Sequence, residues 1–316
     1  MSDAAEILDV VVREVEAGRR AALCVVVATR GSTPQAPGAL LAVDEDGQAA
    51  GTIGGGCVEA DFRARAHHLI SVGRSELRTA NLENDDVTDG MICGGVMDAA
   101  IRVFTSCEEV EPFRSAATRL RAGEDALFPL RVHASGEQVE YRVSIEAPPK
   151  LIIAGGGHLG HALTKLTTAL GFRVKVIDDR LEYANAVRFP APIEFAVGDI
   201  AATLGGERLG RDSYVVIVTR GHRSDEAALA AVIDSPVRYL GMVGSKRKIK
   251  TIYDNLRGRG VSEEQLERVH APIGLAIRAV TPEEIAVSIA AELVAMRRGE
   301  YRKPVEGPFS VNERGE

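Results

Sequence analysis

Apolar residues in the first half of the chain follow two different periods. Between residues 7 and 15 they recur at the spacing of an amphipathic helix, whereas residues 21–28 and 39–43 are apolar runs of strand length. Residues 58–69 return to helical spacing. Further on, the pattern predicts a strand at 96–104, a helix at 111–123 and a hairpin over 128–143. This mixture of elements predicts an α+β domain.

The second half alternates short apolar strands with helical segments. The predicted strands lie at 151–154, 172–177, 193–197, 213–218 and 237–243. This βαβ rhythm is typical of a doubly wound sheet of parallel strands. Residues 146–150 carry paired prolines, which continue neither a strand nor a helix. We therefore predict an N-terminal domain over residues 1–146, a Rossmann-like domain over 150–299 and a polar tail over 300–316.

Composition narrows the class of protein. The chain has 316 residues, 45% of them hydrophobic and 26% charged, which is ordinary for a globular protein of two domains. A formal charge of −7, with no basic runs, argues against nucleic acid and acidic membranes as partners. We see neither an apolar stretch long enough to span a membrane nor the layout of a signal peptide. We therefore expect a cytoplasmic protein.

A glycine fingerprint follows the first strand of the second domain. Gly155, Gly157 and Gly160 match G-x-G-x-x-G, in which the first glycine allows a tight turn, the second lets the backbone approach a pyrophosphate, and the third lets the next helix pack closely. Asp178 follows about 20 residues later, where a carboxylate can accept hydrogen bonds from ribose hydroxyls. The pattern predicts a nucleotide site, and the alternative is a doubly wound domain whose site is unused.

Other polar side chains follow the ends of predicted strands in this domain. In a doubly wound sheet the ligand lies outside the carboxyl ends of the strands, so these side chains should converge there. A histidine in a turn is more often only hydrogen-bonded and solvated, so His222 gains its weight from its neighbours. The set comprises His158, Asp178, Asp199, Arg220, His222, Asp225, Ser245 and Lys246.

The four cysteines are too few and too scattered to form a disulfide scaffold, and no pair has zinc-binding spacing. Cys24 lies in a predicted core strand, and Cys107 has a polar setting that suggests an incidental residue. Cys57 follows the glycines 54–56 at the start of a predicted helix, where exposed N–H groups favour an anion and a reactive thiolate. A tight turn with an incidental cysteine is the alternative.

The remaining cysteine and one loop complete the candidate chemistry of the first domain. Cys93 precedes Gly94 and Gly95, so its sulfur should also lie near accessible backbone amides, although this residue is ambiguous alone. The turn-rich loop at 29–38 concentrates hydroxyls, the amide of Gln35 and the positive charge of Arg30. These groups suit contact with an oxyanion or another polar ligand, and a loop held only by its prolines is the alternative.

Five stretches together resemble the XdhC/CoxI family of molybdenum-hydroxylase maturation factors. They are residues 28–38, 51–59 and 93–95, the glycine fingerprint, and residues 271–275 with 281–289. The chain departs from the family at Ala276 and Arg278, near which an acidic residue and a second glycine are usual. It also departs at Ser224, where a second histidine is common.

The resemblance implies an accessory protein rather than an enzyme, and assigns no catalytic residue. Such a factor binds molybdenum cofactor (molybdopterin), protects it while a cysteine desulfurase installs its terminal sulfur, and delivers it to an apo molybdenum hydroxylase such as xanthine or carbon monoxide dehydrogenase. An N-terminal XdhC/CoxI domain, a Rossmann domain and a homodimer are also implied. Cys57 becomes the first candidate for contact with the cofactor and its metal, and Cys93 the second. Arg30, Gln35 and the glycines Gly54, Gly55 and Gly56 accompany them.

Two other functions stay open. The glycine fingerprint is compatible with an NAD(P)-dependent oxidoreductase that uses His222 or His158 as proton donor, although a fold alone does not establish hydride transfer. A nucleotide-binding redox sensor could instead use Cys57 and Cys93. Under the maturation hypothesis, the Rossmann domain would bind the nucleotide extension of the cofactor or an independent nucleotide.

Overall fold

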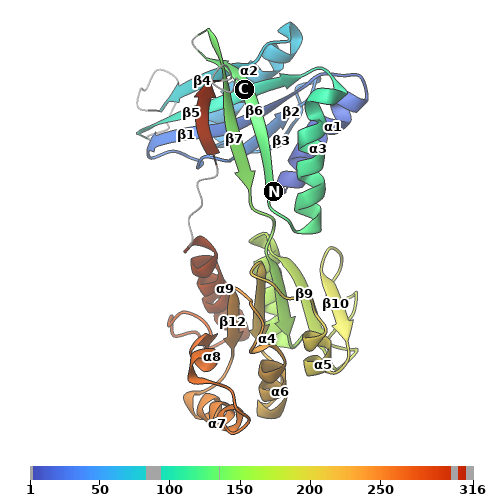
Figure 1. Cartoon of the computed structure of the whole chain (residues 1–316), viewed down its shortest axis with the longest axis vertical. Helices are drawn as coiled ribbons and strands as arrows, with labels where there is room; N and C mark the ends of the chain where they lie inside the picture. Colours follow the sequence, from blue (N-terminus) through green and yellow to red (C-terminus); the bar gives the residue numbers. More distant parts are fainter. Residues whose placement is uncertain (1–2, 83–93, 135, 300–304, 311–316) are drawn as a thin grey trace. The chain divides into compact units, whose positions relative to one another are not determined.

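The computed structural model describes residues 3–82, 94–134, 136–299 and 305–310, and the chain divides into two compact units (Figure 1). Unit 1 comprises Met1–Ala147 together with Arg302–Glu316, and unit 2 comprises Pro148–Tyr301. The chain therefore leaves unit 1 once and returns to it at its end. Within the described residues, no helix is long and apolar enough to cross a membrane.

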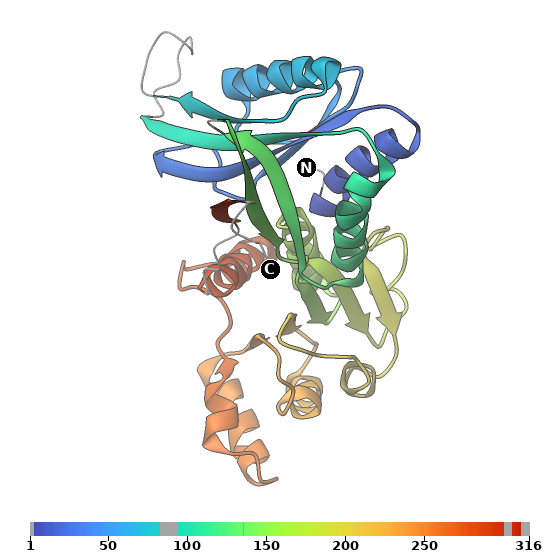
Figure 2. The same ribbon diagram turned by 45° about the horizontal axis from the view of Figure 1, so that its top comes forward.

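Unit 1 is built on a five-stranded antiparallel sheet with the order β3-β2-β1-β5-β4. Its strands are β1 (Ala21–Gly31), β2 (Leu40–Val43), β3 (Ala49–Gly51), β4 (Glu76–Asn81) and β5 (Gly95–Phe104). Helices α1 (Ala4–Glu16) and α3 (Cys107–Ala122) cover one face, and α2 (Gly56–Val72) covers the other (Figures 1 and 2).

Both faces of β1 are buried, which explains its unbroken apolar run. Leu23 and Val25 belong to the core beneath α1 and α3, whereas Cys24 and Val26 belong to the core beneath α2. Successive side chains of a strand point to opposite faces, so a strand covered on both sides needs apolar residues at every position. Cys24 is accordingly a fully buried core residue, and burial raises the pKa of its thiol to about 12.

A second, smaller sheet of unit 1 has the order β14-β7-β6. Strand β6 (Ala126–Ala134) alternates buried and exposed residues and pairs with β7 (Glu137–Ile145), as the predicted hairpin requires. The segment expected as a polar tail contributes β14 (Val305–Ser310), which pairs antiparallel with β7. This strand has no apolar signature because the edge of β7 supplies its backbone hydrogen-bond partners.

Unit 2 contains a six-stranded parallel sheet with the order β10-β9-β8-β11-β12-β13. Its strands are β8 (Lys150–Ala154), β9 (Arg173–Asp178), β10 (Glu194–Val197), β11 (Ser213–Ile217), β12 (Tyr239–Met242) and β13 (Val269–His270). The chain winds outward from β8 in one direction and then from β11 in the other. This is the strand order of dinucleotide-binding folds, and it confirms the doubly wound sheet predicted from the sequence.

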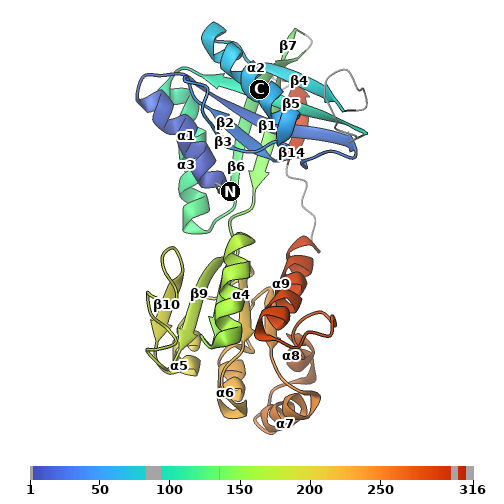
Figure 3. The same cartoon turned by 180° about the vertical axis from the view of Figure 1, so that it is seen from behind.

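Helices cover both faces of this sheet. Helices α4 (His158–Ala169) and α9 (Pro282–Arg298) lie side by side on one face (Figure 3). The other face is covered by α5 (Ile200–Gly205), α6 (His222–Val232), α7 (Lys246–Arg257) and α8 (Glu263–Glu267). The start of α9 is the predicted one, with Thr281 in a capping box and Pro282 at the first helical position.

Besides β14, three features of the fold differ from the prediction. Strand β4 and helix α8 were not predicted, because neither carries a clear apolar period. Helix α3 begins at Cys107 rather than at residue 111, since Ser106 and Glu109 form a capping box that starts the helix earlier. Cys107 consequently occupies the first turn of a helix.

Candidate functional site

Three glycine-containing segments of unit 1 meet at one side of the five-stranded sheet, where several of its strands begin or end. Strands β1 and β3 end on this side and β5 begins there, because β1 and β5 are antiparallel. The segments are residues 30–38, 51–57 and 94–95, and we call them together the glycine edge. A Cβ added at Gly95 would lie 2.4 Å from the Ser32 carbonyl oxygen, and one at Gly54 would lie 2.8 Å from Pro34 Cγ. The loop at 30–38 therefore packs against both of its neighbours.

Cys57 lies at the second residue of α2 and its side chain is exposed. Gly55 and Gly56 precede it with φ angles of 71° and 59°, a left-handed conformation that favours glycine. The first N–H groups of a helix have no partner within the helix and point beyond its end. Cys57 thus lies in the first turn of a helix behind glycines, where the sequence predicts it.

Glu59 holds this glycine turn together, a role that the sequence analysis missed. Its Oε2 atom accepts a hydrogen bond of 3.2 Å from the backbone N–H of Gly55 and another from the Thr52 hydroxyl. Thr52 Oγ1 in turn accepts from the Gly54 N–H at 3.3 Å. A glutamate in the first turn of a helix behind glycines is the sequence signal that could have revealed this cap.

The other predicted residues of unit 1 share the glycine edge, as far as the structure describes them. Arg30 is exposed near the end of β1, opposite Val96 of β5. Gln35 is half-buried, and its carbonyl accepts a 3.0 Å hydrogen bond from the Thr33 hydroxyl. Cys93 lies outside the described residues. Within the part of the chain that the structure describes, no group of three or more His, Cys, Asp or Glu side chains could hold a metal ion.

In unit 2 the glycine fingerprint lies at the carboxyl edge, by which we mean the segments that follow β8, β9, β11 and β12. A Cβ at Gly160 would lie 1.9 Å from the Gly155 carbonyl oxygen, and one at Gly155 would lie 2.5 Å from that of Val218. A Cβ at Gly157 would meet nothing within 4 Å. Two of the glycines therefore allow close packing, and Gly157 leaves the approach to the turn open.

Asp178 ends β9 and is almost completely buried. Its carboxylate accepts four hydrogen bonds, one from the Gly156 N–H at 2.8 Å and three from the backbone N–H and guanidinium of Arg180 at 3.0–3.1 Å. Burial by itself would raise the pKa of Asp178, but the hydrogen bonds from Arg180 and Gly156 outweigh it and hold the pKa below its usual value. A ribose hydroxyl would have to displace one of these donors.

Two arginines beside the glycine turn were not predicted. The Arg180 guanidinium lies 3.7 Å from the centroid of the Tyr183 ring, and that of Arg188 lies 5.3 Å from it. Arg188 also donates a 3.0 Å hydrogen bond to the Gly156 carbonyl oxygen. A Cβ at Gly156 would lie 2.2 Å from the Tyr183 carbonyl oxygen, so this segment packs directly on the turn. Sequence spacing alone does not indicate that contact.

The remaining predicted residues of unit 2 divide into internal and exposed groups. Asp225 is fully buried, accepts hydrogen bonds from the Thr219 N–H at 3.1 Å and hydroxyl at 2.7 Å, and forms an ion pair with Lys248. Asp199 caps α5 by accepting from the Ala202 N–H at 2.8 Å. The exposed residues of the set are His158, Asp199, Arg220, His222, Ser245 and Lys246.

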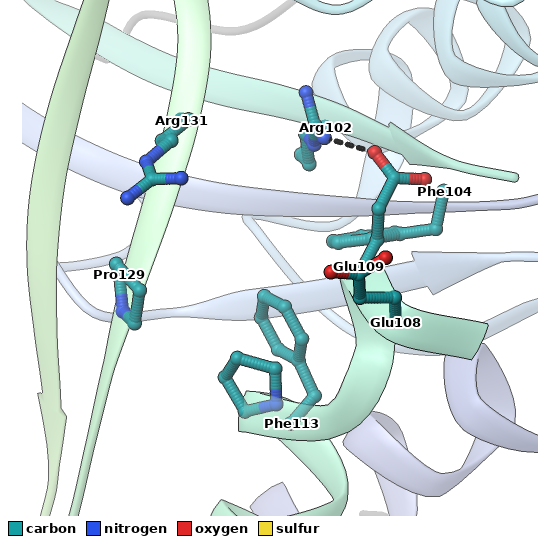
Figure 4. A pocket seen from close by; sticks show the side chains of 8 residues that line it. Arg102, Phe104, Glu108, Glu109, Phe113, Pro129 and Arg131 are labelled. Carbon is teal, nitrogen blue, oxygen red and sulfur yellow. Dashed lines mark hydrogen bonds and ion pairs between the residues drawn. The ribbon is translucent and has the colours of Figure 1, made fainter. Parts of the chain in front are cut away.

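Two cavities of unit 1, of about 270 and 590 Å³, lie at the edge opposite the glycine edge. They share Arg102 and Glu109, which form an ion pair above the edge-to-face rings of Phe104 and Phe113 (Figure 4). None of the residues predicted from the sequence lines either cavity. Arg102 is compensated by Glu109 and Arg65 by Glu76 within the lining of these cavities.

Comparison with known proteins finds a matching family model for each of the two units. The family model described as the XdhC Rossmann domain matches residues 151–293, and the model of the XdhC and CoxI family matches residues 14–81. A crystal structure of a xanthine dehydrogenase from Bacillus halodurans superposes with a TM-score of 0.82 at 22% identity, over 98% of this chain and 99% of that one. At that identity the likeness supports the fold.

Curated relatives cover most of this chain. YqeB of Escherichia coli K12, an uncharacterized protein, is 30% identical over 87% of this chain, which spans only 43% of YqeB. A probable subunit of xanthine dehydrogenase from Bacillus subtilis 168 is 24% identical over 90% of this chain and 95% of its own length. The molybdenum cofactor insertion chaperone PaoD of Escherichia coli K12 is 24% identical over 92% of this chain and 88% of its own length.

These matches agree with the order of the motifs along the sequence and with the parallel sheet of unit 2. The glycine-rich turn before Cys57 falls within the match at residues 14–81, and the fingerprint at Gly155–Gly160 falls within the match at residues 151–293. The chain belongs to the XdhC/CoxI family.

Proposed function

We propose that this chain is a maturation factor that binds molybdenum cofactor and delivers it to a molybdenum hydroxylase of the xanthine or carbon monoxide dehydrogenase type. The names of two relatives, a probable subunit of xanthine dehydrogenase and a molybdenum cofactor insertion chaperone, support this role. The finer steps of the proposal are that the chain holds the cofactor while a cysteine desulfurase supplies sulfur, and that it acts as a homodimer.

The exposed thiol of Cys57 at the start of α2 is the observation that carries the proposal. Thiolate sulfur is a ligand that soft metal centres prefer. The N–H groups at the start of α2 that Glu59 and Thr52 do not occupy, together with the Arg30 guanidinium, suit a phosphate group. The donor set of the glycine edge therefore fits a metal that carries a phosphorylated organic ligand. Gly54, Gly55, Gly56 and Gln35 would shape the same site, and Cys93 is proposed as a second contact.

Unit 2 is proposed to bind a nucleotide at its carboxyl edge, either the nucleotide extension of the cofactor or a separate one such as NAD(P). Gly157 and the first turn of α4 would hold the phosphates, because a helix N-terminus favours an anion. Asp178 and Asp225 would then keep the surrounding loops in place rather than touch the ligand, since their carboxylates already accept hydrogen bonds within the protein.

The test is cofactor retention by the purified protein. After incubation with molybdenum cofactor and removal of the unbound fraction, molybdenum is measured by elemental analysis and the pterin by fluorescence after oxidation. We expect near-stoichiometric retention by the wild-type protein and at least tenfold less by Cys57→Ala, because alanine removes the soft ligand. Cys107→Ala is the matched control, since Cys107 is also exposed in the first turn of a helix in unit 1.

Full retention by Cys57→Ala would remove the thiolate argument. An NAD(P)-dependent oxidoreductase is the second candidate, favoured by the strand order and fingerprint of unit 2. The oxidoreductase would be favoured if the protein retained no molybdenum cofactor, bound NAD(P) tightly and reduced a substrate while oxidising NAD(P)H. Reversible disulfide formation under mild oxidant, without cofactor retention, would favour a redox sensor.

A further inference from the structure

Exposed positive charges gather at one half of the carboxyl edge of unit 2. Arg220 and Arg223 lie beyond the end of β11, and Lys246 and Arg247 lie beyond the end of β12. Within the described residues, none of these four cationic side chains pairs with a carboxylate. We call them the cationic rim. The chain as a whole carries a charge of −7, so this local excess of positive charge is not a property of the average surface.

The backbone holds the segments of the rim close together. β11 and β12 are adjacent parallel strands, and the Val243 N–H donates a 3.0 Å hydrogen bond to the Ile217 carbonyl oxygen at their ends. On the other side of β11, the Val218 N–H donates a 2.8 Å hydrogen bond to the Ala154 carbonyl oxygen, directly before the glycine turn. The cationic rim therefore lies beyond β11 and β12, next to the glycine turn that follows β8. The strand order reverses between β8 and β11.

A buried ion pair fixes the two helices that carry the rim. Asp225 in the first turn of α6 is fully buried and pairs with Lys248 in the first turn of α7. Lys248 Nζ also donates a 3.3 Å hydrogen bond to the Val243 carbonyl oxygen. The ion pair ties the starts of both helices to the end of β12, so the four rim cations have a common, firmly held base.

Nearby carboxylates are already engaged and leave the rim uncompensated. Asp225 is paired with Lys248, and Glu226 is paired with Arg259 and hydrogen-bonded by Asn255 at 2.7 Å. The first turn of α7 carries no acidic residue. The N-terminus of a helix carries a partial positive charge, which repels cations. Lys246 and Arg247 at the start of α7 are therefore in an unfavourable position for the stability of the helix. An anion bound at this position would relieve both effects.

We infer that the part of the ligand lying over β11 and β12 is anionic, so that unit 2 selects a nucleotide with terminal phosphates over a pyridine dinucleotide. In a dinucleotide that spans the switch in strand order, the far half would lie against the cationic rim. A nicotinamide ring has no negative charge to offer there, and its oxidised form is itself positive. This inference rests on the proposed nucleotide binding of unit 2 and gives it a ligand class.

The test compares nucleotides of different charge by titration calorimetry on the full chain. The probes are ATP, GTP and CTP, the matching mono- and diphosphates, NAD⁺ and NADP⁺. We expect at least one triphosphate to bind more tightly than its own monophosphate and than both pyridine dinucleotides, with an affinity that falls steeply as salt is added. The double variant Arg220→Gln/Lys246→Gln should bind that triphosphate at least tenfold more weakly and lose most of the gain over the monophosphate.

Arg211→Gln is the matched control, because Arg211 is exposed before the start of β11, at the opposite edge of the sheet. It should leave the affinity within twofold of the wild type. Tighter binding of NAD⁺ or NADP⁺ than of every triphosphate would overturn the inference, as would equal effects of the rim and control variants, or no nucleotide binding at all. Molybdenum-cofactor retention, measured on the same proteins, separates this failure from failure of the proposed function, which depends on Cys57.

Discussion

The carboxylate of Asp178 illustrates how much a single residue's role depends on its partners. The residue stands where a dinucleotide-binding fold places its ribose acceptor, yet its four acceptor positions are filled by Gly156 and Arg180. A hydrogen bond to a charged group stabilises a protein by about 1.5–3 kcal/mol, and its removal leaves buried donors without a partner. The carboxylate therefore joins the end of β9 to the glycine turn.

We predict that Asp178→Asn lowers the free energy of unfolding by about 1.5–3 kcal/mol at pH 7, because the neutral amide presents donors to donors. Urea denaturation measures the change. Asp179→Asn is the control, since the Asp179 side chain is 57% exposed and should change stability little. Equal effects of the two substitutions would contradict this role for Asp178.

The effect of Asp178→Asn on stability should depend on pH. The pKa of Asp178 in the folded protein lies below its ordinary value of 3.8. The stabilisation by the carboxylate is therefore complete above that ordinary value and is lost as the pH falls through the folded-state pKa. The difference in stability between wild type and Asp178→Asn should accordingly persist at pH 5 to 7 and shrink below about pH 4.

For single residues, the sequence predicted the location in a helix or strand better than the contacts of the side chain. It placed Cys57 at a helix start behind glycines, because that pattern is local and is found in α2. It could not reveal that Asp225 pairs with Lys248, 23 residues away, since the pair depends on how two helices dock. Arg278, where the family usually has a glycine nearby, adopts a left-handed φ of 61°. The backbone there has kept a glycine-like conformation without the glycine.

Among the elements, the strand, turn and helix formed by β8 and α4 show what the fingerprint requires. Gly160 allows the helix to lie against the Gly155 carbonyl oxygen, whereas Gly157 borders open space. The two glycines of one motif thus have separable roles, one in packing and one in access. Because Gly157 has a φ of −61°, an alanine fits its backbone conformation as well.

We predict that Gly160→Ala destabilises the protein by about 3 kcal/mol or more, since its methyl group would overlap a backbone oxygen that cannot move without shifting β8 or α4. Gly157→Ala should leave the unfolding free energy within about 1 kcal/mol of the wild type but weaken nucleotide binding at least tenfold, because its methyl group faces the approaching phosphate. Chemical denaturation and calorimetry measure the two effects. A stable Gly160→Ala protein would refute the packing role.

Elements with a strong apolar period were predicted from the sequence, whereas strands that pair at the edge of a sheet without such a period were not. Strands β8, β11 and β12 of unit 2 are buried on both faces, so their apolar runs identify them without knowledge of their neighbours. Strand β4 has mostly half-buried residues, and β14 follows a polar segment. Their positions are decided by the free edges of β5 and β7, which a local pattern does not contain.

For the whole molecule, the path of the chain matters as much as the two folds. Unit 1 contains both the beginning and the end of the described chain, with β14 added to the edge of β7. The sequence indicated a boundary near residues 146–150 but gave no sign that the chain returns. A returning strand contributes only backbone pairing at an edge, and backbone pairing leaves no residue pattern.

We predict that deletion of residues 302–316 destabilises unit 1 by about 2–4 kcal/mol and leaves unit 2 unaffected, since the lost pairing comprises several backbone hydrogen bonds of about 1 kcal/mol each. Amide hydrogen exchange should show faster exchange in β7 and unchanged exchange in β8 and β11. The bared edge should also promote self-association, measured by light scattering. Deletion of 311–316 alone is the control, because it retains β14.

The return of the chain to unit 1 also determines how the molecule carries mechanical load. If the two ends are pulled apart, tension entering at the C-terminus passes from β14 across its hydrogen bonds to β7 and on through unit 1 to α1. Unit 2 is inserted between the two linkers and lies off this path. It would bear no tension until β14 detached, so β14 in unit 1 would shield the parallel sheet of unit 2 from the load.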